Sequence, residues 1–301
     1  MKFNNLFTAI EEMTQQLGLE IDNIVEKLSG ENMAEIEEQA MAQMHEAEVM
    51  CFDRQPVAEL DGKTVTAYIK EMEADMFLEL LADPMLYLID FLPDSVEEKV
   101  ASYKGTEYES KIAAVTKQFC TLNFDSQSTE VATALKLYSK CGDADLFDVI
   151  FRLNEASFRM VEQGDADWEV VQDAVVVALH NCEGDNVCST VVEYIKEASV
   201  LTAMHTPLLR YLADYPEYAE DTYALLKRGV KESMDRPFLL ELFGKVGNHR
   251  AIGFIKGFID KNPALVDRLF LTEAVRAVMD LEGDPNDLIE MYQKLFANDE
   301  E

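Results

Sequence analysis

The stretch that decides the fold lies toward the end of the chain and reads Leu242-Phe243-Gly244-Lys245-Val246-Gly247-Asn248-His249-Arg250-Ala251-Ile252. Apolar residues recur at helical spacing on both sides of the central Gly247-Asn248 pair. Glycine readily takes the left-handed conformation that ends a helix, and asparagine accepts hydrogen bonds at the start of the next one. The stretch therefore predicts two helices joined by a tight turn.

The same turn signal recurs through the second half of the sequence. Gly-Asp or Gly-Asn pairs stand at Gly142-Asp143, Gly164-Asp165, Gly184-Asp185, Gly247-Asn248 and Gly283-Asp284. Proline follows a capping residue at Thr206-Pro207, Asn262-Pro263 and Asp284-Pro285, and proline is favoured in the first turn of a helix. Short helices joined by tight turns are typical of α-solenoids. We therefore expect an all-α fold in which residues 126–301 form stacked antiparallel helix pairs.

A family resemblance appears when the opening stretch is followed onward. It continues through Asp260-Lys261-Asn262-Pro263-Ala264-Leu265-Val266 and Glu273-Ala274-Val275-Arg276-Ala277-Val278, and it ends at Leu281-Glu282-Gly283-Asp284-Pro285. This order of a helix, an Asn-Pro turn, an alanine-rich second helix and a Gly-Asp-Pro exit resembles a HEAT repeat over residues 242–285. The resemblance is fainter over 142–241 and absent before residue 125. It implies helix pairs stacked into a curved surface that often binds other macromolecules, and it implies no chemistry.

The first 125 residues predict a less regular helical region. Its apolar stripe at helical spacing runs through Phe3, Leu6, Phe7, Ile10, Met13, Leu17, Ile21, Ile24, Val25 and Leu28. Residues 31–52 combine strong helix formers and many glutamates with a thin apolar face, and Gln55-Pro56 through Asp61-Gly62 predicts a loop. We therefore expect residues 31–62 to be exposed or mobile. Ser95 with Glu98, and Thr106 with Glu109, have the spacing of capping boxes that begin helices.

The formal net charge of −32, with a pI near 4.3, limits the partners of this chain. Nucleic acid is an unfavourable partner, because its binding depends on Lys and Arg displacing counterions. Anionic membrane surfaces are repelled as well. The charge suits a cationic protein partner; the alternatives are a general contribution to solubility and a salt-adapted source.

The cysteine content and the apolar runs suggest a compartment. The five cysteines are odd in number and widely spread, which favours reduced thiols over a disulfide framework. No apolar run approaches the roughly 18 residues that a membrane span needs, and the start of the chain lacks the pattern of a secretory signal. We therefore expect a cytoplasmic protein.

One segment departs from the acidic composition. Residues 227–276 contain ten Lys or Arg and six acids, a balance of +4 that leaves −36 for the rest of the chain. From this segment we take Lys245, Arg250, Lys256 and Arg268 as a candidate patch for a partner or an anion; ordinary i,i+4 ion pairing on helix faces is the alternative. Gly253 and Gly257 in the same segment predict close packing against a neighbouring helix, or else a flat surface for a ligand.

The sequence offers little for catalysis or for a cofactor. His180, Cys182 and Cys188 have side chains that suit zinc, but their spacing is not that of a zinc motif, and small residues packing at a helix junction account for them. Neither phosphate-binding glycine motif is present, and no carboxylate pair stands out among 58 acids. We therefore expect no catalytic residue, no metal site and no cofactor.

These observations favour a non-catalytic interaction scaffold that binds a protein segment, which we expect to be basic, on an acidic curved surface. Aromatic and methionine side chains would anchor that segment. Three alternatives stay open. They are a HEAT-like protein that binds or processes nucleic acid through the 227–276 segment, a small-molecule enzyme built on such repeats, and self-assembly.

Overall fold

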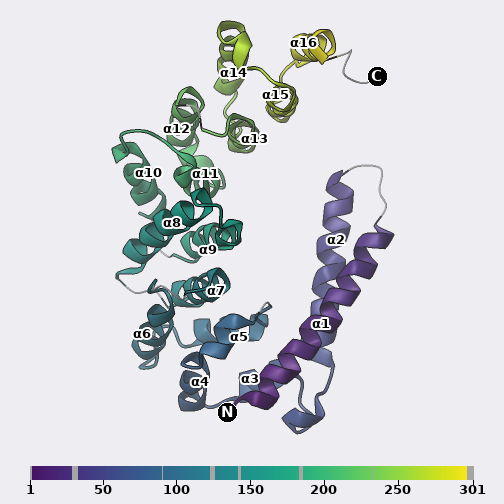
Figure 1. Ribbon diagram of the computed structural model, residues 1–301, viewed down its shortest axis with the longest axis vertical. Coiled ribbons are helices and arrows are strands. Elements are labelled where there is room, and N and C mark those ends of the chain that lie inside the picture. The colour runs from purple at the N-terminus through teal and green to yellow at the C-terminus, as the bar shows by residue number, and fades with distance from the viewer. Residues whose placement is uncertain are drawn as a thin grey trace. The chain divides into compact units, whose positions relative to one another are not determined.

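A computed structural model describes residues 2–28, 33–89, 91–122, 126–141, 144–182, 186–232 and 234–296 (Figure 1). Over these ranges sixteen α-helices and several short 3₁₀ or π turns are present, with no β-strand and one isolated bridge between Val57 and Lys63. The expected all-α class is confirmed. Within the same ranges, no helix has both the length and the apolar character needed to cross a bilayer.

The chain divides into two compact units, residues 1–153 and 154–301. Helix α8 (Leu146–Glu162) contains the division. The predicted division after residue 125 falls instead within the first unit, and residues 123–125 lie outside the described ranges. On either side of them, α6 (Glu109–Phe119) and α7 (Ser128–Ser139) pack against each other, which places both helices in one unit.

The first unit begins with α1 and α2. In chain order its elements are α1 (Asn4–Lys27), α2 (Met33–Glu48), a π turn (Val49–Arg54), a 3₁₀ turn (Ala58–Leu60), α3 (Val65–Glu71), α4 (Ala74–Leu81), a 3₁₀ turn (Pro84–Leu88), α5 (Asp94–Ser102), α6 and α7. The predicted stripe of α1 is buried only in its first half, at Leu6, Phe7, Ile10, Met13 and Leu17. Farther along, Leu19 and Val25 are 66% and 55% exposed. The second half of α1 therefore leaves apolar surface uncovered in this unit.

Within the segment 31–62, the described residues from Met33 on form a helix first and a packed part after it. The described side chains of α2 are exposed or half-buried, and Met41 is among the most exposed. Beyond α2, in contrast, Cys51, Phe52, Val57 and Leu60 are buried, and Phe52 stacks on Phe91 with ring centroids 5.6 Å apart. The thin apolar face that the sequence shows thus belongs to α2 alone, because the residues after it enter the core.

Neither predicted capping box forms. Helix α5 begins at Asp94 after Pro93, so Ser95 lies inside its first turn and its side chain caps nothing. Helix α6 begins after Tyr108, whose backbone N–H donates to the Thr106 hydroxyl in a local turn. Each helix has its N-cap two residues away from the residue that the spacing indicated, at Pro93 in place of Ser95 and at Tyr108 in place of Thr106.

The second unit contains the remaining helices. In chain order they are α9 (Glu169–Asn181), α10 (Val187–Glu197), α11 (Thr206–Leu212), α12 (Ala219–Lys231), α13 (Arg236–Val246), α14 (Arg250–Lys261), α15 (Arg268–Asp280) and α16 (Asn286–Phe296), with 3₁₀ turns at Ala166–Trp168, Ala203–His205, Pro216–Tyr218 and Pro263–Leu265. The main packing contacts join α9 to α11, α12 to α13, α13 to α15 and α15 to α16. As predicted, Thr206-Pro207 begins a helix, because proline fits the first turn.

The glycine turns follow the prediction at two described positions. Gly247 ends α13 in the left-handed conformation (φ 71°), Asn248 accepts from the backbone N–H of Arg250 (3.1 Å), and Gly164 has φ 97°. At the third position Glu282 takes the left-handed conformation instead (φ 55°), and Gly283 serves close packing. The pairs Gly142-Asp143 and Gly184-Asp185 include residues outside the described ranges.

The contact between α13 and α15 depends on small residues. Ala274 and Ala277 of α15 are fully buried. On α13, a Cβ at Gly244 would lie 2.7 Å from Oδ2 and 3.1 Å from Cβ of Asp280. Small side chains let the two helix backbones approach closely, and this contact fixes α13 beside the helices that form the site described next.

Candidate functional site

The four cations of the predicted patch all have partners within the second unit. Lys245 Nζ lies 2.5 Å from Oδ1 of Asp214, and Arg250 lies 2.5 Å from a carboxylate oxygen of Glu220. Lys256 Nζ lies 2.8 Å from Oδ1 of Asp287 and holds the pKa of that carboxyl below its usual range.

Arg268, the last of the four, donates from Nε to the Tyr292 hydroxyl at 2.7 Å. Ion pairing and hydrogen bonding across neighbouring helices therefore account for the predicted patch. These partners reduce what the four side chains can offer a ligand. The pairs of Lys245, Arg250 and Lys256 are long-range, and they are not the i,i+4 pairs on one helix face that the alternative expected.

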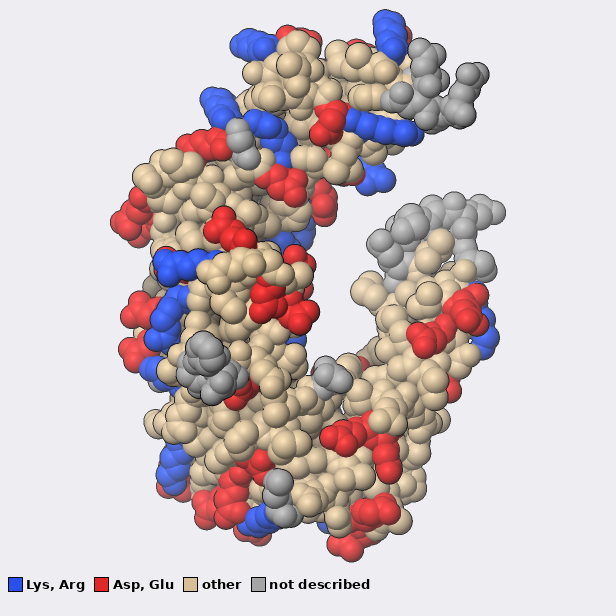
Figure 2. All heavy atoms as spheres, viewed as in Figure 1, with Lys and Arg blue, Asp and Glu red and all other residues tan. Residues whose placement is uncertain are grey.

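A different set of cations surrounds a cavity beside this patch. The cavity has a volume of about 460 Å³, and its lining residues are Lys227, Lys231, Arg236, Gly253, Phe254, Gly257, Phe258, Lys261, Asn262 and Leu265. Helices α12 and α14 supply most of them, and none is acidic. Blue spheres are frequent over the α12–α16 part of the second unit in Figure 2. We call this lining set the cationic groove.

The cationic groove extends into a second cavity of about 380 Å³. The two cavities share Lys227 and Lys231. The second is also lined by two carboxylates, and each of these has a partner: Glu220 pairs with Arg250, and Glu232 with Arg228 at 2.8 Å. Neither carboxylate is paired with the shared lysines.

Three lysines of the cationic groove have no carboxylate partner. In the part of the chain that the structure describes, no carboxylate oxygen lies within 4.0 Å of Nζ of Lys227, Lys231 or Lys261. Lys227 instead has its ammonium 5.7 Å from the ring centroids of Tyr223 and of Phe254. Such cation–π contacts leave the hydrogen-bond donors of the ammonium available to an anion.

Arg236, the first residue of α13, lines the same groove as Lys227. Its Nε donates to the backbone carbonyl of Val230 at 3.0 Å, and its guanidinium carbon lies 5.7 Å from the ring centroid of Phe258. These contacts hold the guanidinium near the Phe258 ring in the lining of the groove. Positive charge and aromatic surface are therefore combined in one place.

The two glycines of α14 lie at the open side of this groove. A Cβ built at Gly253 or Gly257 would meet nothing within 4 Å, and both glycines line the cavity. Close packing against a neighbouring helix, the first interpretation of their spacing, is therefore wrong. The alternative, a flat surface, describes them: the helix backbone is bare at this point.

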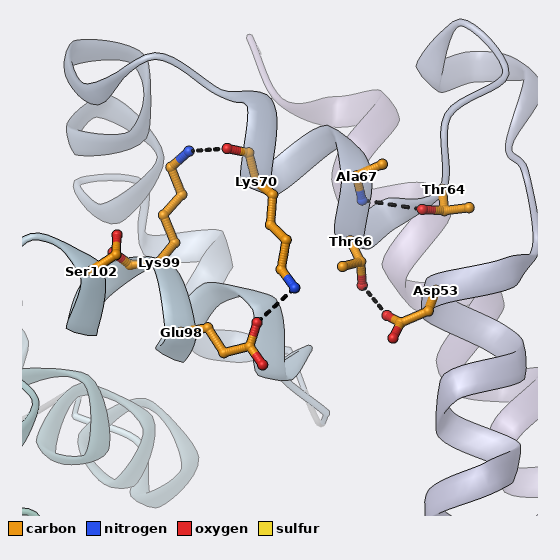
Figure 3. A network of polar contacts seen from close by, with 8 residues as sticks. All are labelled: Asp53, Thr64, Thr66, Ala67, Lys70, Glu98, Lys99 and Ser102. Atoms are coloured by element: carbon orange, nitrogen blue, oxygen red, sulfur yellow. Dashed lines mark hydrogen bonds and ion pairs between the residues drawn. The ribbon is translucent and has the colours of Figure 1, made fainter.

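The first unit has a pocket of opposite character. Its volume is about 90 Å³, and it is lined by His45, Glu48, Val49, Phe52, Asp53, Thr66, Lys70, Asp94, Ser95 and Glu98. We call it the acidic pocket. Asp53 accepts a hydrogen bond from the Thr66 hydroxyl, and Lys70 pairs with Glu98 at 2.8 Å (Figure 3). Four carboxylates thus face two basic side chains. Each of these already has a carboxylate partner, since His45 Nδ1 lies 3.9 Å from Oε2 of Glu48.

Glu48 and Asp94 are neighbours in the lining of the acidic pocket. Burial raises the pKa of Glu48, and the neighbouring Asp94, within hydrogen-bonding reach, raises it further. Beside them Ser95 is 2% exposed, and its hydroxyl has no hydrogen-bond partner among the described residues. Two carboxyl groups in contact and an unused buried hydroxyl are an arrangement that a cationic group would complete.

Lys99 follows the pocket residue Glu98 in the chain, but its side chain binds backbone carbonyl groups at the end of α3. Its ammonium donates to the backbone carbonyl of Lys70 at 2.8 Å (Figure 3). It also donates to the backbone carbonyl of Met72 at 2.5 Å, where α3 ends. Burial lowers the pKa of Lys99. A cation at the C-terminal end of a helix interacts favourably with its unpaired carbonyl groups.

His180, Cys182 and Cys188, whose side chains suit zinc, each contact different groups in the second unit. His180 has Nε2 3.2 Å from Oδ2 of Asp214 and Nδ1 3.2 Å from the Tyr215 hydroxyl. Cys182 contacts the carbonyl of Ala178, and Cys188 is buried beside the Tyr211 hydroxyl. Among the described residues, no group of three or more His, Cys, Asp or Glu is placed to hold a metal ion.

Sequence reasoning included the groove lysines in the basic segment but did not select them. Lys227 and Lys231 are four residues apart, as are Gly253 and Gly257, so each pair lies on one face of its helix. The equal four-residue spacing of these lysines and of these glycines was the signal in the sequence that could have pointed to the groove. The partners that neutralise Lys245 and Arg250 come from α11–α12, about thirty residues earlier in the chain, and no local pattern reveals them.

Comparison of the chain with protein-family models, with curated proteins and with solved structures finds no match.

Proposed function

We propose that this protein is a non-catalytic interaction scaffold that binds a basic protein segment through the acidic pocket of its first unit. The observation that carries the proposal is that the neighbouring Glu48 and Asp94 carboxyl groups line the same small pocket as the buried Ser95 hydroxyl, which has no hydrogen-bond partner among the described residues. One ammonium or guanidinium group placed between them would offset the repulsion of the two carboxylates. It would also give the Ser95 oxygen a donor.

The dimensions of the acidic pocket suit a side chain better than a larger ligand. A volume of about 90 Å³ corresponds to about three water molecules, which is also the scale of a guanidinium head group. The aliphatic stem of a Lys or Arg would pass over the half-exposed rim, where such stems readily lie on apolar surface. Phe52 provides apolar surface in the lining.

The surroundings of the pocket would draw a basic segment toward it. With a net charge of −32 the chain attracts cations over a distance of about 8–10 Å at physiological salt. The face of α1 and α2 in view in Figure 2 is mainly tan and red. Exposed Leu19, Val25 and Met41 on these helices add apolar surface for aromatic or aliphatic anchors.

We further propose that helix pairs of the second unit stack as a HEAT-like solenoid. The contacts of α12 with α13, α13 with α15 and α15 with α16 support this proposal, because each helix packs on near neighbours in the chain. The scaffold role suits such an architecture, since stacked pairs present extended surfaces. The cytoplasm is the compartment we propose for it, where the five cysteines would stay reduced.

A nucleic-acid-binding function is the second candidate, and the cationic groove is the observation that favours it. The remainder of the chain opposes it, because the phosphate backbone would meet strong negative charge on either side of the groove. Binding of a single-stranded oligonucleotide that weakens steeply with salt would support this candidate.

The proposal is tested by fluorescence anisotropy of the full chain with a labelled lysine- and arginine-rich peptide. The double variant Glu48→Gln/Asp94→Asn should weaken binding about tenfold or more, since charge-assisted hydrogen bonds contribute roughly 1.5–3 kcal/mol each. The control Glu12→Gln/Asp22→Asn removes the same charge from exposed positions of α1 and should change affinity by less than about twofold. Equal weakening by both pairs would reduce the interaction to general electrostatics and overturn the proposal.

A further inference from the structure

We infer that the cationic groove between α12 and α14 binds an acidic polypeptide segment that also carries apolar side chains. This site lies in the second unit, uses other residues than the acidic pocket, and takes a ligand of opposite charge. It therefore extends the function proposed above and does not depend on it.

The charge of the groove is the first argument. Acids outnumber bases in this chain by 58 to 26, yet the larger cavity is lined by four cations and no acid. Like charges held around one cavity repel each other, and in an acidic protein carboxylates to neutralise them are plentiful. Their absence from the lining leaves a carboxylate-bearing ligand as the group that would relieve the repulsion.

The availability of these cations is the second argument. Lys227, Lys231 and Lys261 pair with no described carboxylate, whereas Lys245, Arg250 and Lys256 nearby are all paired. A ligand that binds the first three gains ion pairs without breaking any. The cations that form ion pairs within the protein and the lysines that are available to a ligand are thus different residues.

The apolar surface of the groove is the third argument. Phe254 and Phe258 are half-buried in the lining, and Leu265 is 44% exposed at its edge. These residues offer contacts to aliphatic or aromatic side chains between the charged positions. A simple inorganic anion would leave this surface unused.

The combined length of the cationic groove and of the second cavity into which it extends indicates a segment rather than a small molecule. Along α12 the two cavities together are lined from Glu220 to Lys231, which at about 1.5 Å per residue is a path of about 17 Å. An extended chain covers that distance with about five residues. Bare backbone at Gly253 and Gly257 would let the main chain of such a segment approach α14 closely.

The same features favour a polypeptide over nucleic acid. A five-residue segment needs only two or three carboxylates to meet the free lysines, whereas a nucleic-acid strand brings a phosphate at every step into the field of an acidic protein. Three of the four cations are lysines, which act as compact point charges and suit single carboxylates.

The test is the affinity of the full chain for a fluorescein-labelled peptide in which Glu alternates with Leu and Phe, measured by anisotropy. Lys227→Gln/Lys231→Gln should lower the affinity about tenfold, as the loss of two partly exposed ion pairs implies. Gly257→Leu should lower it about tenfold or more by filling the groove, with no loss of thermal stability because the added side chain enters open space. The control Lys196→Gln/Arg276→Gln makes the same charge change on α10 and α15 and should leave the affinity within about twofold.

Three results would overturn the inference. The first is a Gln-for-Glu version of the peptide that binds equally well. The second is a labelled single-stranded oligonucleotide that binds more tightly than the peptide and is lost in the same variants. The third is concentration-dependent self-association of the unliganded protein that Lys227→Gln/Lys231→Gln abolishes, which would assign the groove to a second copy of the chain. A result here is independent of the basic-peptide measurement on Glu48 and Asp94, so the two proposals fail separately.

Discussion

The ammonium group of Lys227 on α12 lies 5.7 Å from the ring centroid of Phe254 on α14. This contact crosses between two helices that line the same groove, and it holds the lysine on an aromatic face instead of in an ion pair. A double-mutant cycle with Lys227→Met and Phe254→Leu should give a coupling free energy of about 0.5–1 kcal/mol in urea unfolding. A coupling indistinguishable from zero would mean that the ring does not hold the ammonium.

The glycines of the second unit should respond to alanine in opposite directions. A Cβ at Gly283 would lie 2.8 Å from Ile252 Cδ1 and 3.1 Å from the carbonyl oxygen of Val278, so Gly283→Ala should cost about 1–3 kcal/mol of unfolding free energy. Gly257→Ala meets nothing and should raise stability by up to about 1 kcal/mol, because glycine is a poor helix former. Thermal unfolding of both variants checks the contrast; a loss at Gly257 would show that α14 is packed there.

Glu48 should make the first unit more stable as the pH falls. Burial and Asp94 raise the pKa of Glu48 in the folded state above its ordinary 4.5, so the folded form holds this proton at a higher pH than the unfolded form does. The stabilising contribution is full below pH 4.5 and is lost as the pH rises through the folded-state pKa. Glu48→Gln should therefore raise the melting temperature at pH 7 and leave it unchanged near pH 4, whereas Glu46→Gln, at an exposed position, should leave it unchanged at both pH values.

His205 should give the second unit the opposite pH dependence. Burial lowers the pKa of His205 below its ordinary 6.5, and its Nδ1 lies 3.1 Å from both the backbone nitrogen and the carbonyl oxygen of Thr202. The folded form then binds fewer protons than the unfolded form, so stability is full above pH 6.5 and declines as the pH falls through the folded-state pKa. His205→Gln should flatten the decline between pH 7.5 and 5.5 in thermal unfolding. An unchanged decline would assign it to other groups.

The sequence predicted the helical class and several turns, because these follow from local rules. Gly247 and Gly164 end helices in the left-handed conformation, and Thr206-Pro207 begins α11, as glycine and proline chemistry requires. The capping-box spacing of Ser95 failed because Pro93 sets the start of α5 at Asp94. The choice between these starts depends on how the preceding chain enters the helix, which spacing alone does not define.

The site residues could not be separated by sequence in the same way. Lys227 and Lys245 belong to one basic segment, but only Lys245 lies within reach of Asp214, which is 31 positions earlier. Likewise, the spacing of Gly253 and Gly257 fits both close packing and an open surface, and the position of the neighbouring helix decides between them. Long-range placement, and not residue type, determines which cations stay available.

The central claim, a scaffold that binds a basic segment at the acidic pocket, is tested most directly by hydrogen–deuterium exchange of the full chain with and without the lysine- and arginine-rich peptide. The account predicts that the peptide slows amide exchange at the end of α2 and in the first turn of α5, around Glu48, Asp94 and Ser95, with the cationic groove of α12 and α14 unchanged. Protection spread evenly over the acidic surface, or confined to the second unit, would contradict it.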